Sequence, residues 1–155
     1  MPTRRQVLSM LAAATAAAAV PPVFSAPGTN ARKVHLFSKH LQWLDYGPMA
    51  ETAAGIGFDG IDLTVRPKGH VLPENVERDL PQAVAAIREA GLVADRITTA
   101  ATDPGDPLTL KILETAAKLD IGIYRMGWLK YDRDRPIPEQ LDAYRAQLEK
   151  LAQIN

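Results

Sequence analysis

The sequence predicts an α/β fold of four strand–helix units, with parallel strands and helices on the outside. Three observations predict it. Short apolar strand candidates alternate with longer helical segments four times after residue 33. Residues 60–65 alternate apolar and polar side chains, which is the two-residue period of a strand. The units recur about every 30 residues, close to the repeat of an eight-unit barrel of ~250 residues.

Four strands are expected, and each is short and largely apolar. They occupy residues 34–37, 60–65, 92–100 and 121–126. In the second strand Asp62 points away from its apolar neighbours Ile61 and Leu63, because successive strand residues face opposite sides of a sheet. This strand is therefore expected to have one apolar face and one polar face.

Proline and glycine mark the ends of four helical segments. The segments begin near Pro48, Pro73, Pro107 and Pro138. Gly57 and Gly91 stand where left-handed C-caps would end the first two, and Asp106 is a suitable N-cap for the third. Pro81 is expected to divide the second segment into a short first turn and a main helix, because proline removes a backbone donor. The last helix carries one apolar face, formed by Leu141, Tyr144, Leu148 and Leu151.

Two arrangements of these units stay open. Helices that return the chain to the same end of a sheet imply parallel strands. A doubly wound sheet usually has five strands and a glycine-rich phosphate loop near its start, and this sequence has no such loop. We therefore favour a (β/α)4 half of a barrel over a complete four-stranded doubly wound domain.

The first 25 residues have the pattern of a twin-arginine export signal. Arg4 and Arg5 precede an alanine-rich apolar run at residues 7–20. That run is short of the ~20 residues that cross a bilayer, so we expect cleavage after Ser25 and no stable membrane anchoring. Residues 26–33 are expected to be a flexible lead-in and residues 34–155 the folded domain. The expected location is periplasmic or secreted.

Charge and cysteine content exclude several classes of function. The chain has 18 basic and 18 acidic residues and no basic stripe, so nucleic acid is not an expected partner. There is no cysteine, which excludes disulfides, thiolate catalysis and thiolate metal sites.

The segment at residues 57–73, GFDGIDLTVRPKGHVLP, resembles the second strand and following loop of xylose-isomerase-like TIM barrels. These are sugar phosphate isomerases and epimerases, and exported, twin-arginine-tagged members carry a similar stretch. The resemblance covers residues 34–155 as the N-terminal half. In that family a divalent metal (Mn, Mg or Zn) is held by glutamate, aspartate and histidine from strands five to eight. The resemblance therefore implies no metal ligands and no cofactor in this chain, and a metal only in a complete barrel.

Asp62 and His70 are the expected catalytic residues. His70 follows the second strand in a loop, and a neutral imidazole suits general acid/base work. It would equally serve as a loop histidine that caps a carbonyl. Asp62 is expected on the inner side of the barrel, where it would line the pocket or form a buried ion pair with Arg66.

Five further residues are expected to bind substrate: Arg66, His40, Trp43, Trp128 and Lys130. Arg66 could hold a carboxylate or phosphate through two hydrogen bonds. The tryptophans could stack on sugar faces or simply pack at the rim. His35, inside the first strand, is expected to be a packed histidine, while Thr98 and Thr99 are expected to be strand residues without a functional role.

The sequence predicts a sugar (phosphate) isomerase- or epimerase-like protein that is incomplete for metal-dependent catalysis. Its expected partner is a small sugar or polyol. The alternative is a non-catalytic, exported half-barrel that binds carbohydrate weakly or associates with itself. Edge strands present unpaired backbone groups, so two copies could close an eight-stranded ring as a homodimer.

Overall fold

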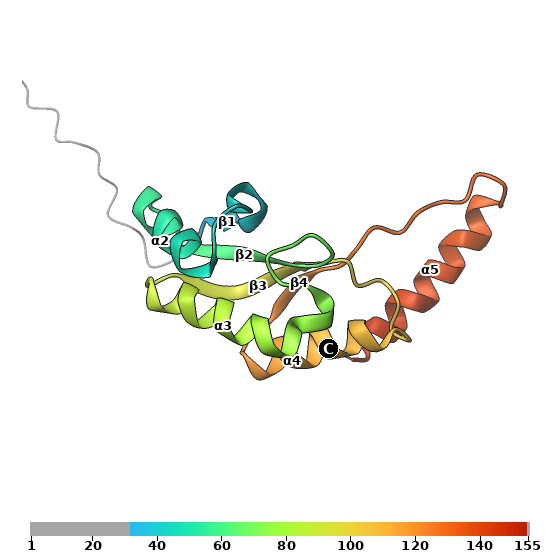
Figure 1. The fold of residues 1–155 in the computed structure, drawn as a ribbon. Helices are drawn as coiled ribbons and strands as arrows, with labels where there is room; N and C mark the ends of the chain where they lie inside the picture. Colours follow the sequence, from blue (N-terminus) through green and yellow to red (C-terminus); the bar gives the residue numbers. More distant parts are fainter. Residues whose placement is uncertain (1–31, 155) are drawn as a thin grey trace, which may run out of the picture. The chain divides into compact units, whose positions relative to one another are not determined.

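A computed structural model describes residues 32–154, which form a four-stranded sheet and its helices (Figure 1). The expected signal peptide, residues 1–25, lies outside the described residues, as does most of the expected lead-in. In chain order the elements are β1 (His35–Phe37), η1 (Ser38–Leu41), α2 (Tyr46–Ile56), β2 (Gly60–Val65), η2 (Pro73–Asn75), α3 (Val76–Glu89), β3 (Val93–Thr99), α4 (Pro107–Lys118), β4 (Ile123–Arg125) and α5 (Ile137–Ala152).

The sheet has the strand order β1-β2-β3-β4, and every neighbouring pair is parallel. This confirms the expected α/β architecture with four parallel strands in one sheet. Each strand lies beside the next one in the chain, so each connection moves the chain one strand further in the same direction. The described strands show no reversal of order, which is the feature that marks the switch point of a doubly wound sheet.

Helices α2, α3 and α4 pack in one layer on one face of the sheet. Helix α3 contacts both α2 and α4, and Figure 1 shows α3 and α4 along the same side of the strands. The buried residues of β2 on this face, Ile61, Leu63 and Val65, are at most 1% exposed and join the same apolar cluster as the helices. Each contributes about 1.5–3 kcal/mol by leaving water, so this layer is the hydrophobic core.

The opposite side of the sheet, which we call the open face, carries polar and aromatic side chains. Phe37 pairs in register with Asp62, and Thr98 pairs with Arg125. Because strand residues alternate between faces, these side chains point away from the buried Leu63 and its neighbours. The alternation predicted for the second strand is confirmed by the burial of Leu63 and the half-exposure of Asp62.

A β-bulge in β3 shapes the amino-terminal end of the open face. The register shifts between Gly60 and Asp62 of β2, so that β3 carries one extra residue there. The neighbouring side chains of Asp95 and Arg96 consequently meet, with 2.9 Å between Oδ1 and Nε, and this hydrogen bond lowers the pKa of the Asp95 carboxyl. His35, with a nearly buried side chain, brings its Nε2 to 3.1 Å from Asp95 Oδ1. His35 is thus packed, as predicted.

The helix ends agree with the predicted capping residues, with one correction. Gly57 follows α2 in the left-handed conformation, with φ 100°, and Asp106 accepts a hydrogen bond from the backbone N of Leu108 at the start of α4. The prediction that Pro81 divides the second helical segment is wrong. Pro81 lies inside α3, and the separate first turn is η2, which ends at Asn75. Pro81 removes one donor near the start of α3, and the buried face of the helix offsets that loss.

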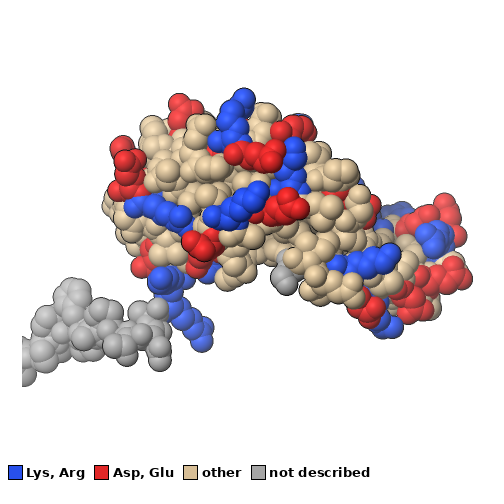
Figure 2. Space-filling model, turned by 90° about the horizontal axis from the view of Figure 1, so that it is seen from below, with Lys and Arg blue, Asp and Glu red and all other residues tan. Residues whose placement is uncertain are grey.

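The outer surface over the helices is polar and mixed in charge. Figure 2, seen from the side of α3 and α4, shows lysine and arginine interspersed with aspartate and glutamate. Lys111 of α4 pairs with Glu77 of α3 across this layer, with 2.9 Å between Nζ and Oε2. Within residues 32–154 no helix is both long enough and apolar enough to span a bilayer.

We predict that Gly60→Ala destabilises the fold strongly. A Cβ at this position would lie 2.4 Å from Cδ2 of His35 and 2.6 Å from the carbonyl oxygen of Val93, so ring and backbone must both shift. Overpacking of this kind costs about 1–3 kcal/mol. Gly55→Ala, in α2 with nothing within 4 Å of its Cβ, is the matched control and should be neutral or stabilising. Urea unfolding of both variants tests this, and equal stabilities would contradict it.

Candidate functional site

The carboxyl ends of three strands place one predicted site residue, Arg66, beside two residues that were not predicted, Phe37 and Arg125. Phe37 ends β1, Arg66 follows β2 directly, and Arg125 ends β4. Parallel strands bring their carboxyl ends to one edge of a sheet, which is where α/β proteins bind ligands. This edge is therefore the candidate site.

The loop after β2 begins with a tight turn at residues 66–69. The backbone N of Gly69 donates to the carbonyl of Arg66 at 2.8 Å, Pro67 occupies the second position, and Lys68 has φ 59°. A Cβ on Gly69 would lie 2.9 Å from the carbonyl oxygens of Arg66 and Thr64, so only glycine fits there. The loop then returns to the strand, where Val71 N donates to Thr64 O and Arg66 N donates to Val71 O, each at 3.1 Å.

His70 anchors this loop to β2 through one ring nitrogen and to η1 through the other. Nδ1 lies 3.4 Å from Oγ1 of Thr64, and Nε2 lies 3.3 Å from the carbonyl oxygen of Leu41. A carbonyl only accepts, so Nε2 carries the proton and Nδ1 accepts from the Thr64 hydroxyl. The hydroxyl of Ser38, buried at 3.1 Å from Thr64 Oγ1, completes the chain.

The surroundings of His70 favour the neutral imidazole. Burial lowers the pKa of His70, and its backbone hydrogen bond to Leu41 opposes that shift only in part. A hollow of about 450 Å³ opens beside the ring, lined by Gln42, Leu44, Asp45, Tyr46, Gly69 and His70. In this geometry His70 acts first as a link between the loop and η1, which is the carbonyl-capping alternative stated for it above.

Asp62 is held by a threonine and not by an arginine. Oγ1 of Thr98 lies 2.9 Å and 3.0 Å from the two carboxylate oxygens of Asp62. One hydroxyl hydrogen serves both oxygens, so the carboxylate keeps lone pairs for other donors. The alternative of an ion pair with Arg66 is wrong, since the ion pairs within the described part of the chain do not include Asp62. Thr98 therefore has a role that the sequence did not indicate.

Two arginines lie against the ring of Phe37. The guanidinium carbons of Arg66 and Arg125 are 5.9 Å and 5.8 Å from the ring centroid. Arg125 also lies 5.7 Å from the ring centroid of Trp128, and His40 meets Phe37 edge to face at 5.9 Å. The side chains of Phe37 and Arg125 thus meet although their strands, β1 and β4, are the two edges of the sheet.

The remaining predicted residues lie apart from this cluster. Trp43 is 76% exposed beyond η1, and no ring contact joins it to Phe37. Lys130 is exposed in the loop before α5, where its carbonyl accepts a hydrogen bond from the Tyr144 hydroxyl. Sequence reasoning missed Phe37 and Arg125. Their signal is that each is the last residue of a strand and falls in register with a polar residue, Asp62 or Thr98.

The described residues do not fit a divalent metal. Across residues 32–154 no three histidine, aspartate or glutamate side chains gather as a ligand set. Asp62 and His70 both keep protein partners instead. We therefore derive no chemical step through a metal ion.

Comparison with known proteins found no family model, curated protein or solved structure that matches the chain. Membership of the xylose-isomerase-like family and the export signal therefore stay predictions from the sequence.

We predict that, because of His70, the free energy of unfolding decreases as the pH is lowered through mildly acid solution. The pKa of His70 is lowered in the folded state, so the unfolded chain takes up the proton first as pH falls below about 6.5. The free energy of unfolding then keeps decreasing until the pH falls below the pKa of His70 in the folded state. The lowered pKa of Asp95 acts only below about 4, outside this window. His70→Gln should flatten the unfolding free energy between about pH 7.5 and pH 5.

Urea denaturation at several pH values measures this dependence, with His40→Gln as the matched variant because His40 is exposed. His40→Gln should keep the slope of the wild type. A wild-type slope in His70→Gln would show that His70 is not the group responsible.

Proposed function

We propose that the chain forms a (β/α)4 half of a xylose-isomerase-like barrel and binds a sugar or polyol at the carboxyl ends of its strands. The proposal includes export by the twin-arginine pathway to the periplasm or beyond, as Arg4 and Arg5 indicate. Isomerase or epimerase chemistry would belong to the barrel as a whole. For the residues described, the proposed role is to bind and orient the ligand.

The observation that carries this proposal is the sequential parallel order β1-β2-β3-β4 beneath a single layer of helices. A (β/α)8 barrel repeats this arrangement around its axis, with its site at the carboxyl ends of the strands. Phe37 and Arg66 lie at that end, and Asp62, in register with Phe37, lies on the same face, which such a barrel would turn inward.

The chemistry of these side chains suits a polyhydroxylated ligand. The carboxylate of Asp62 can accept from ligand hydroxyls while Thr98 holds it in place. The exposed ring of Trp128 offers a flat apolar surface beside Arg125, and such surfaces pack against the C–H faces of sugars. His40 is exposed and meets Phe37 edge to face, so it is a candidate for a further ligand contact, and Lys130, exposed in the loop before α5, is proposed as a more distant one.

Calorimetric titration of the full chain with pentoses, hexoses and polyols tests the proposal. We expect saturable binding of at least one of them, weakened about tenfold or more in Asp62→Asn, because a hydrogen bond to a charged group contributes about 1.5–3 kcal/mol. Asp142→Asn, an exposed carboxylate on α5, is the matched control and should bind as the wild type does. Absence of saturable binding, or equal binding by both variants, would reject this function.

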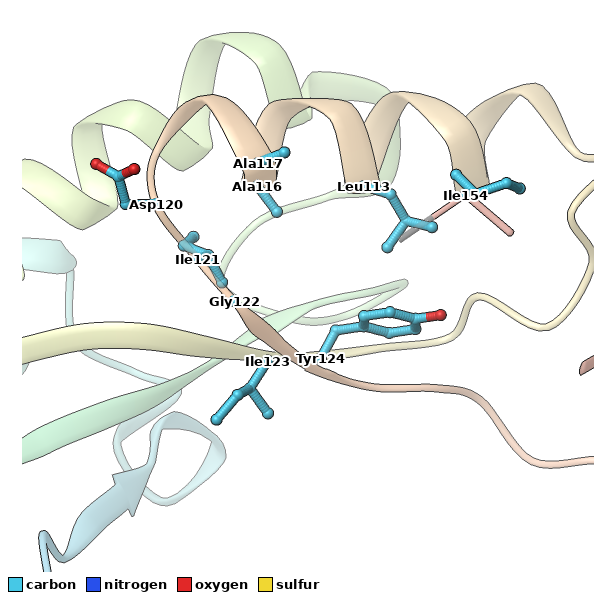
Figure 3. A pocket seen from close by; sticks show the side chains of 9 residues that line it. All are labelled: Leu113, Ala116, Ala117, Asp120, Ile121, Gly122, Ile123, Tyr124 and Ile154. Atoms are coloured by element: carbon cyan, nitrogen blue, oxygen red, sulfur yellow. The ribbon is translucent and has the colours of Figure 1, made fainter. Parts of the chain in front are cut away.

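A second candidate function is self-association, favoured by the apolar edge beside β4. Ile123 is 52% exposed on this edge strand. A groove of about 660 Å³ runs between β4 and α4, and Figure 3 shows Tyr124 and Leu113 facing each other across it while Ile123 points to the other side of the strand. A twofold axis along the strands would pair β4 of one copy with β1 of another, parallel at both junctions.

Light scattering during size exclusion tests this second function. We expect a concentration-dependent dimer for the wild type and a monomer for Ile123→Lys, because a lysine on an edge strand opposes pairing. Ile56→Lys, at the exposed end of α2, should leave the dimer intact. A monomeric wild type at every concentration would remove self-association and leave the sugar site untouched.

A further inference from the structure

Arg66 and Arg125 follow or end two different strands, and both reach the ring of Phe37 on a third strand. Their proximity is therefore set by the fold. Arg66 follows β2, Arg125 ends β4, and both lie against Phe37 at the end of β1. Both guanidinium carbons are less than 6 Å from one ring centroid, so they lie within about 12 Å of each other. The Debye length at physiological ionic strength is about 8 Å, so salt screens much of the repulsion between the two charges.

Neither arginine has an acidic partner. Within residues 32–154 the arginines that form ion pairs are Arg78, Arg96 and Arg145. The carboxylate of Asp62, on the same face, accepts from Thr98 and forms no ion pair with either arginine. The Nε of Arg66 is buried without a hydrogen-bond partner. A buried donor of a charged group is costly to leave unsatisfied, and no acceptor within the described residues relieves this cost.

We propose that Arg66 and Arg125 form a clamp for an oxyanion, and that the preferred ligand is a sugar bearing a carboxylate or a phosphate. This inference rests on the proposed sugar site and adds the charge class of its substrate. Guanidinium groups present forked N–H donors that match the paired oxygens of carboxylate and phosphate. Phe37 orients both groups, and Trp128 supports Arg125 from a second side.

Three hexoses that differ at carbon 6 test the clamp: glucose, glucuronate and glucose 6-phosphate. In calorimetric titrations of the full chain, we expect at least one of the two anions to bind tenfold or more tightly than glucose. Raising NaCl from about 20 mM to about 0.5 M should weaken anion binding and leave glucose binding unchanged. The tighter anion identifies whether carboxylate or phosphate is the oxyanion. Inorganic phosphate should compete with both anions and not with glucose.

Three variants distinguish anion binding by the clamp from a general attraction of anions to positively charged residues. Arg125 is exposed, so Arg125→Gln should fold normally and lower the ratio of anion affinity to glucose affinity tenfold or more. Arg66→Lys keeps the charge but loses the forked donors, so it should also reduce the preference for the anionic hexoses over glucose. Arg133→Gln, in the exposed loop before α5 and outside the ion pairs, should bind all three hexoses as the wild type does.

The outcomes distinguish the clamp from the sugar site. Equal affinity of the wild type for all three hexoses would overturn the clamp while glucose binding that depends on Asp62 still supports the sugar site. Anion preference that persists in both Arg125→Gln and Arg66→Lys would also overturn the clamp. Binding of the anions alone would support the clamp and reject the site for neutral sugars, and binding of none would reject both.

Discussion

The parallel pairing of β2 with β3 is the interaction on which the rest of the structure depends. Its register sets Leu63 beside Ile97 on the helical face and brings Thr98 to Asp62 on the open face. A shift by one residue would turn every side chain of β2 to the opposite face, exposing Leu63 and burying the carboxylate of Asp62. The free energy of core burial therefore also fixes the geometry of the candidate site.

The open face stays polar because neighbouring strands satisfy one another's charges. The bulge in β3 places Asp95 where His35 can reach it, and the missing side chain of Gly60 leaves room for the ring of His35. Arg96 then shares the carboxylate of Asp95. Polar groups on a half-covered face are costly unless they are paired. Toward the amino-terminal end of the strands Asp95 pairs with Arg96 and lies 3.1 Å from His35 Nε2, while neither ring nitrogen of His35 has a hydrogen-bond partner. At the carboxyl end Arg66 and Arg125 lack such partners.

The sequence predicted what depends on local pattern and missed what depends on register. Alternation placed Asp62 opposite the core, and single residues such as Gly57 fixed helix ends, because each is decided within a few neighbours. Thr98 acquires its role from Asp62, which lies 36 residues away in the chain. Arg125 acquires its role from Phe37, which lies on another strand. The bulge that sets their alignment has no local signature. Pro81 was misjudged because tertiary packing of α3 outweighs one lost hydrogen bond.

The loop after β2 joins the two features that the sequence made conspicuous, His70 and Arg66. Arg66 is bound through its own backbone to Val71 and Gly69, and His70, which stands between these two residues, is fixed to Thr64 and to η1. Loosening the imidazole would therefore release the backbone that aims the guanidinium group. A histidine with both nitrogens engaged contributes to a ligand site by positioning, since it leaves the arginine free to make the contact. Its neutral state suits that task, because it adds no further positive charge beside Arg66.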